Sequence, residues 1–259
     1  MLKEFRILTL LSVLLMASGA QATRIGMLDY ALHSDLTATV TGGSEAKMDA
    51  GTISIPTHVS YNEKIYKVTA IEDKAFAGWK TLEWVKLPIT MVTIGEGAFR
   101  GCTNLKFVDI DGDAMMEIKP WAFGGCTSLM AFKVPPLLKK LGNNAFDGCT
   151  NLGSINFGEV IENLEEIPAG LCKGCTSLRV VYIPPTSNIK KIRDEAFQNC
   201  AFEWILIPEK VESLGWNVFK GCKELKHISC RIMKPITINS NVFDESNYKN
   251  AVLGIPKGT

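Results

Sequence analysis

The sequence has almost no excess of charge of either sign, because 28 basic residues stand against 27 acidic ones among its 259 residues. Without a positive excess there is no global field to attract nucleic acid or anionic lipid, so we expect no nucleic-acid partner. Histidine is also scarce: the three histidines lie far apart, and neither a metalloprotease motif nor a nucleophile elbow accompanies them. These absences predict a protein that is not an enzyme, with no catalytic residues, no metal ligands and no cofactor.

Long apolar runs are missing from the sequence after its first 22 residues. At the start, Lys3 and Arg6 precede an apolar stretch at 7–16, and the small residues at 20 and 22 fit a cleavage site. The stretch is shorter than the ~20 apolar residues that a membrane-spanning helix needs. We therefore predict a signal peptide at 1–22, no membrane span, and a mature protein that is secreted or held at the cell surface.

What the sequence does contain is an internal repeat of roughly 23 residues. The segment AFRGCTNL begins at Ala98, and close copies begin at Ala122 and Ala145. About eight copies align in columns. The aromatic column is Phe76, Phe99, Phe123, Phe146, Cys172, Phe197, Phe219 and Phe243. The aliphatic column, five residues earlier, is Ile71, Ile94, Ile118, Leu141, Ile167, Ile192, Leu214 and Ile238. The third column, three residues after the aromatic one, is Trp79, Cys102, Cys126, Cys149, Cys175, Cys200, Cys222 and Ser246.

Each copy continues with alternating apolar residues, as in Val85-x-Leu87-Pro88, which is typical of a short strand with one buried face. The block before the aromatic residue is too short for a long helix, so we expect a short extended piece and a tight turn. One copy cannot bury its apolar face alone. The copies should therefore stack, with corresponding strands about 4.8 Å apart in a parallel sheet.

The pattern I-G-x-x-A-F-x-x-C-x-x-L-x-x-V-x-L-P resembles the BspA-like leucine-rich repeat of bacterial secreted and cell-surface proteins. The resemblance implies a β-rich leucine-rich-repeat solenoid of about eight ~23-residue repeats at 68–259. It also implies protein binding and adhesion to macromolecules of host or neighbouring cells. Residues 23–67 lack the repeat but alternate like strands, so we predict that they form a β-rich N-terminal cap over the open end of the solenoid.

The cysteines and one acidic segment offer apparent chemistry that the repeat register explains in simpler terms. Six cysteines share one inward column, where we expect them to pack as free, buried thiols. The CxxC motif formed by Cys172 and Cys175 places both residues in core columns, and Cys230 falls at an inward strand position. The segment 109–113 resembles the start of a calcium loop but lacks its later ligands, so we interpret it as a solvated turn.

The outward strand positions supply the candidate binding surface. Trp84 and Phe107 should adjoin near the N-terminal end, and a second apolar group should form at the fifth and sixth copies. Exposed aromatic residues grouped in this way suggest a contact site, although they are also ordinary sheet-forming residues. The predicted surface consists of Trp84, Lys86, Phe107, Asp109, Val180, Tyr182, Trp204 and Leu206.

We accordingly predict a non-catalytic binding module whose partner is a protein or glycan on host or neighbouring cells. One alternative is a structural spacer in a surface assembly, and another is a polysaccharide-binding or polysaccharide-active protein. An enzyme of the last kind needs clustered acids on adjacent rungs, and no two carboxylates face outward on neighbouring strands. Asp73 and Glu96 do stack on adjacent rungs, but they lie in a turn that we interpret as a solvated edge.

Overall fold

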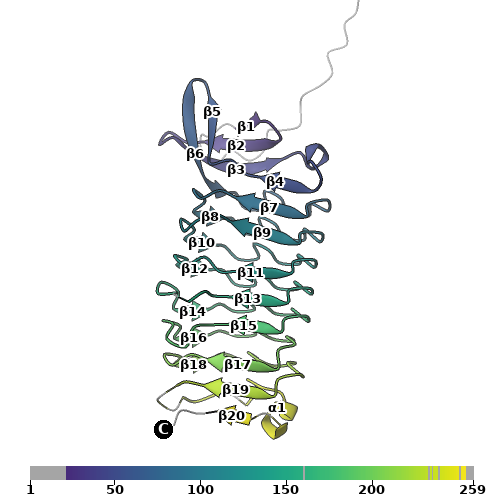
Figure 1. Cartoon of the computed structure of the whole chain (residues 1–259), viewed down its shortest axis with the longest axis vertical. Coiled ribbons are helices and arrows are strands. Elements are labelled where there is room, and N and C mark those ends of the chain that lie inside the picture. The colour runs from purple at the N-terminus through teal and green to yellow at the C-terminus, as the bar shows by residue number, and fades with distance from the viewer. Residues whose placement is uncertain are drawn as a thin grey trace, which may run out of the picture.

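The computed structural model describes residues 22–159, 161–232, 234, 236–238, 240–250 and 252–254. Apart from Ala22, the predicted signal peptide lies outside these residues. The described chain winds into an elongated solenoid whose coils stack along one axis (Figure 1). The coils between the two ends each contribute one longer strand to one face and one two-residue strand to the other, as the alternation and the short extended block predict.

The longer strands form one face, which we call the long-strand face. They pair in parallel in three successive groups, β4-β7-β9, β11-β13-β15 and β17-β19-β20. The strands are β4 (Thr52–Ser54), β7 (Trp84–Leu87), β9 (Phe107–Ile110), β11 (Ala131–Lys133), β13 (Ser154–Asn156), β15 (Val180–Tyr182), β17 (Trp204–Ile207), β19 (His227–Cys230) and β20 (Val252–Gly254). The apolar alternation therefore sets both their length and the side that they bury.

The two-residue strands form the opposite face, which we call the short-strand face. They also pair in parallel. One group, β8-β10-β12, continues from the longer strand β6 (Lys64–Ile71), and the other is β14-β16-β18. The strands are β8 (Thr93–Ile94), β10 (Glu117–Ile118), β12 (Lys140–Leu141), β14 (Glu166–Ile167), β16 (Lys191–Ile192) and β18 (Ser213–Leu214). The second residue of each comes from the aliphatic column and is buried.

The first coil is covered by strands outside the repeat. They are β1 (Ala22–Ile25), β2 (Leu28–Leu32), β3 (Thr37–Gly43), β5 (His58–Tyr61) and β6 (Lys64–Ile71), with a 3-10 turn at Glu45–Lys47. β1, β2 and β3 are antiparallel, whereas β3 pairs in parallel with β6. β6 runs across the predicted boundary at 67/68 and continues into the short-strand face, so the two predicted segments share one strand.

The columns form the core, as the register predicts. The aromatic column is fully buried from Phe76 to Phe219, and neighbouring rings stack almost parallel. The ring centroids of Phe99 and Phe123 are 5.4 Å apart, at an interplanar angle of 2°. The last copy departs from the prediction, because Ile238 is 41% exposed. A short helix, α1 (Glu245–Asn250), follows in place of the expected turn.

The cysteine column lies in the same core. All eight cysteines are free, and the six column thiols donate from Sγ to a carbonyl oxygen of the preceding coil at 3.1–3.2 Å. Cys172 and Cys175 are both fully buried, so the CxxC motif is a packing feature. Burial raises the pKa of Cys172 well above its ordinary value, which disfavours the reactive thiolate. Cys230 has the predicted inward register, since it pairs with the buried Ile207, but at the end of β19 it is only half-buried.

Two positions in each turn have positive φ. The position two residues after the aromatic column is Gly78, Gly101, Gly125, Gly148, Gly174, Asn199 or Gly221. Only glycine and asparagine adopt this conformation readily, which explains the recurrent glycine of the motif. The position two residues before the column also has positive φ, but there it carries larger side chains such as Lys74 and Trp121. Stacking of the coils imposes the conformation on these residues.

Candidate binding surface

The outward positions of the long-strand face carry the exposed apolar residues that the sequence predicts. Of the predicted surface residues, the exposed large hydrophobic ones are Trp84, Phe107, Val180, Tyr182 and Trp204. They form two groups, one on β7 and β9 and the other on β15 and β17. Ala131 and Ser154 occupy the outward positions between them, so the structure does not join the two groups into one patch.

The N-terminal group brings four predicted residues together. The ring centroids of Trp84 and Phe107 are 5.8 Å apart, and Lys86 places its Nζ atom 4.6 Å from the Trp84 ring centroid. The Trp84 indole donates from Nε1 to Asp109 Oδ2 at 2.9 Å, across to the next coil. The indole N–H and the Lys86 ammonium are therefore already engaged, and this group is ordered before any ligand arrives.

The C-terminal group consists of Val180, Tyr182 and Trp204. Trp204 is 47% exposed, and Tyr182 lies one coil before it. The prediction that Leu206 joins them is wrong, because this side chain is only 8% exposed. Leu206 has the outward register and pairs with Ser229 of β19, yet it is covered, so alternation alone does not decide which outward residues are exposed.

A shallow hollow of about 390 Å³ lies beside the N-terminal group. Asp109, Asp111 and Asp113 line it from one coil, and Lys133 and Pro135 from the next. The turn at 111–113 is exposed, as its interpretation as a solvated turn predicts. Among the described residues no three His, Cys, Asp or Glu side chains are grouped so as to hold a metal ion.

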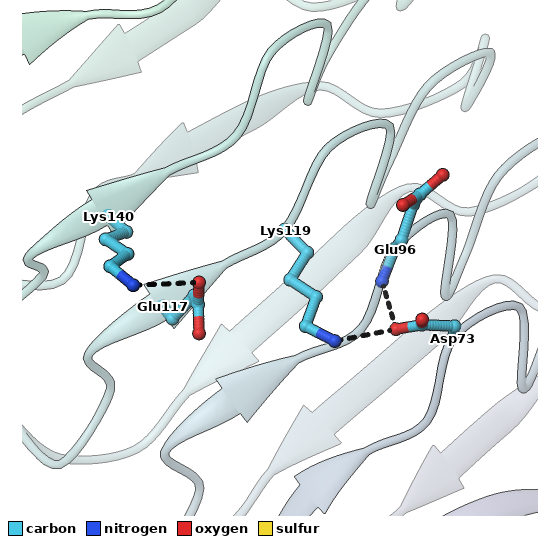
Figure 2. Close-up of polar contacts among 5 residues, drawn as sticks. All are labelled: Asp73, Glu96, Glu117, Lys119 and Lys140. Carbon is cyan, nitrogen blue, oxygen red and sulfur yellow. Dashed lines mark hydrogen bonds and ion pairs between the residues drawn. The ribbon is translucent and has the colours of Figure 1, made fainter. Parts of the chain in front are cut away.

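The short-strand face is chemically different, because its charges pair with one another along the solenoid. Lys140 Nζ lies 3.8 Å from Glu117 Oε1 on the adjacent coil, and Figure 2 shows this pair. On the following two coils, Arg193 Nη2 lies 2.7 Å from Glu166 Oε2. Lys190 and Glu165 form a similar pair at 3.1 Å. Ion pairs exposed in this way contribute little stability each. They neutralise part of the charge on this face, on which Lys139, Lys191 and Glu212 make no ion pair within the described residues.

The acids on adjacent rungs, Asp73 and Glu96, belong to this face and act as structural groups. Asp73 Oδ1 accepts the backbone N–H of Glu96 at 2.8 Å and lies 3.0 Å from the Lys119 ammonium. Partial burial alone would raise the pKa of Asp73, but these two contacts outweigh it and hold the pKa below its ordinary value. The Glu96 carboxylate points away from Asp73 (Figure 2). The two carboxyl groups therefore do not converge on a common point, as a glycosidase pair must.

No helix in the described part of the chain combines the length and apolar character needed to cross a membrane. A comparison with curated proteins gives no match.

Solved structures share this architecture. A leucine rich cell surface protein from Faecalibacterium prausnitzii is 28% identical, with a TM-score of 0.73 over 87% of this chain. The chain spans 58% of the length of that protein. A leucine-rich repeat protein from Bacteroides ovatus is 23% identical, with a TM-score of 0.55, and covers 90% of this chain and 71% of its own. A T. pallidum leucine rich repeat protein is also 23% identical, with a TM-score of 0.52, and the match covers 79% of this chain and 91% of that protein. The latter two are similar in fold alone.

The repeats themselves match a family model. The model, described as a BspA type leucine rich repeat region of six copies, matches residues 69–200 and 160–256, which together span most of the chain. The matched segments contain the stacked columns, both faces of the solenoid and the two exposed groups. The chain therefore belongs to the BspA-type leucine-rich repeat family.

Proposed function

We propose that this protein is a non-catalytic binding module that contacts a protein or glycan of host or neighbouring cells through its long-strand face. The observation that carries the proposal is the contrast between the two faces. Trp84 and Phe107, and likewise Tyr182 and Trp204, are grouped in solvent on the long-strand face, whereas the short-strand side has the isolated exposed Trp216 and several ion pairs between its coils. Exposed, grouped aromatic residues on a rigid solenoid are a frequent basis of recognition.

The proposal places the protein outside the cell, either secreted or retained at the surface. Two observations support this location. The N-terminal 22 residues have the pattern of a signal peptide, and the similar protein of Faecalibacterium prausnitzii is a cell surface protein. In an exported protein the free thiols would meet oxidising conditions, and burial protects those of the column from them.

Binding without catalysis is favoured because Asp109 on the candidate surface and Asp73 on the opposite face already have structural partners. Asp109 accepts the Trp84 indole N–H, and Asp73 accepts a backbone N–H and pairs with Lys119. A hydrolase of polysaccharides would need two carboxyl groups facing one bond. The proposal accordingly includes no cofactor.

The test compares the mature wild-type protein with a Trp84→Ala, Tyr182→Ala, Trp204→Ala triple variant on immobilised host matrix proteins and glycans. Trp216→Ala is the matched control, because Trp216 is 60% exposed but follows β18 on the short-strand side. We expect wild type and the control to bind alike, and the triple variant to bind at least about tenfold more weakly. Equal binding by the triple variant would refute the long-strand face as the contact surface. A structural spacer would bind none of the panel in any form.

A further inference from the structure

The two exposed groups differ in whether their polar atoms already have partners within the protein. In the N-terminal group the Trp84 indole N–H is donated to Asp109, and Lys86 covers the ring. Within the described residues, the Trp204 indole N–H and the Tyr182 hydroxyl make no hydrogen bond. The C-terminal group thus keeps both its aromatic faces and its hydrogen-bonding groups available.

The outward strand positions around this second group are neutral and hydrogen-bonding, while Arg179 and the ion-paired Glu203 and Lys226 flank the starts of the strands. The outward positions of β13, β15, β17 and β19 contain no Lys, Arg, Asp or Glu. Asn156 pairs with Tyr182 in the sheet register, and His227 pairs with Trp204. The Asn156 amide uses its oxygen to accept the Gly158 N–H at 2.7 Å, which leaves its NH₂ group free. A charged partner would find no opposite charge on these four strands.

We infer that the surface formed by Asn156, Tyr182, Trp204 and His227 binds a neutral polysaccharide that lies along the solenoid axis. The inference rests on the proposed function and names its ligand class. The C–H faces of pyranose rings pack on Tyr and Trp rings, and sugar hydroxyls both donate and accept hydrogen bonds. A ligand that covered the rings without such groups would leave four polar side chains dehydrated and unbonded, which is costly.

The spacing of the coils supports the axial direction. Parallel strands repeat about every 4.8 Å. The residues of an extended β-linked glycan advance by a similar distance, so each coil faces one sugar residue. Tyr182 and Trp204 then contact consecutive sugars of a chain that crosses the coils at a slant, because β15 and β17 belong to consecutive coils and the two residues stand at opposite ends of their strands (Figure 1). β15 ends one three-stranded sheet and β17 begins the next, so the surface extends over several coils, which suits a chain better than a single compact ligand.

The experiment is affinity electrophoresis of the mature protein in gels that contain neutral polysaccharides: laminarin, xyloglucan or galactomannan. Parallel gels contain heparin or polygalacturonate. The variants are Tyr182→Ala, Trp204→Ala and the control Trp216→Ala, which removes an exposed tryptophan on the short-strand side. We expect a neutral polysaccharide to retard the wild type, with about a tenfold weaker affinity for each variant of the second group and no change for the control. Thermal unfolding checks that every variant is folded.

Four outcomes would overturn the inference. If matrix proteins bind the long-strand face but no neutral polysaccharide retards the chain, the glycan assignment fails while the proposed function stands. Retardation only by heparin or polygalacturonate would assign a charged ligand instead. Retardation that survives both Tyr182→Ala and Trp204→Ala would place the glycan elsewhere. If neither polysaccharides nor matrix proteins bind, the proposed function fails as well.

Discussion

The buried cysteine column makes thiol reactivity a sharp test of how the coils stack. Cys102, Cys126 and Cys149 are fully buried, and each donates to a carbonyl oxygen of the preceding coil at 3.1 Å. Burial raises the pKa of Cys102 and of Cys222 to about 12, and that of Cys126 well above its ordinary value. The nucleophile in thiol chemistry is the thiolate, so these groups should react very slowly in the folded protein.

The size of the effect follows from the pKa. At about pH 8 roughly one in ten ordinary thiols of pKa 9.0 is ionised, whereas a pKa of about 12 leaves about one in ten thousand. Reaction should therefore slow by roughly a thousandfold from ionisation alone. Lack of access adds to this, because the coil must first open. Cys230 is the exception, since it is only half-buried, and it should supply the one fast thiol.

The assay is titration with Ellman's reagent at about pH 8, first on the folded protein and then in guanidinium chloride without reductant. We expect at most one rapidly reacting thiol in the folded protein and all eight after unfolding. Cys230→Ser should remove the rapid phase and nothing else. Two or more rapid thiols would refute the buried column. Fewer than eight after unfolding would reveal disulfides and contradict the stacking geometry.

Two further substitutions test the turns. Gly95→Ala would place a Cβ atom 2.5 Å from the Asp73 backbone nitrogen, so we expect the free energy of unfolding in a denaturant titration to fall by about 1–3 kcal/mol. Gly153→Ala is the control, because its nearest neighbour lies at 3.5 Å, and it should change the free energy of unfolding by less than about 1 kcal/mol. Equal effects would contradict the close approach of the coils. Asp73→Asn tests the pH dependence: because the folded pKa of Asp73 is depressed, its stabilising effect is complete above the unfolded pKa and is lost as the pH falls through the folded value. As the pH falls below about 5, the unfolding temperature should therefore decrease less steeply in the variant than in wild type. Identical slopes would show that Asp73 does not contribute to the pH dependence of stability.

The repeated columns made most of the fold predictable. Phe99, Phe123 and Phe146 recur at a fixed spacing, and only stacking buries all of them together, so the register follows from the sequence. Prediction failed where the repeat weakens. Ile238 keeps the column spacing but is exposed, because the chain departs from the earlier coils at this point. The helix α1 was not predicted either, although Glu245 in its first turn and Lys249 in its last turn fit a helix.

For the candidate surface, the sequence predicted on which side of its strand each residue lies, but not which neighbours it contacts. Alternation places Trp204 and Leu206 on the same side, and only the packing of neighbouring strands separates an exposed residue from a covered one. The Trp84–Asp109 hydrogen bond joins residues that are diagonal neighbours on paired strands, so the register could have indicated it. The free polar groups of Asn156 are visible only once each partner in the structure is known.

The claim that the long-strand face is the contact surface is tested most directly by oxidative footprinting of the protein with and without a bound ligand from the binding panel. Hydroxyl radicals modify exposed aromatic side chains, so a covered residue loses reactivity. The account predicts strong protection of Tyr182 and Trp204 and unchanged oxidation of Trp216, which is 60% exposed on the other side. Protection of Trp216 with full oxidation of Trp204 would contradict it.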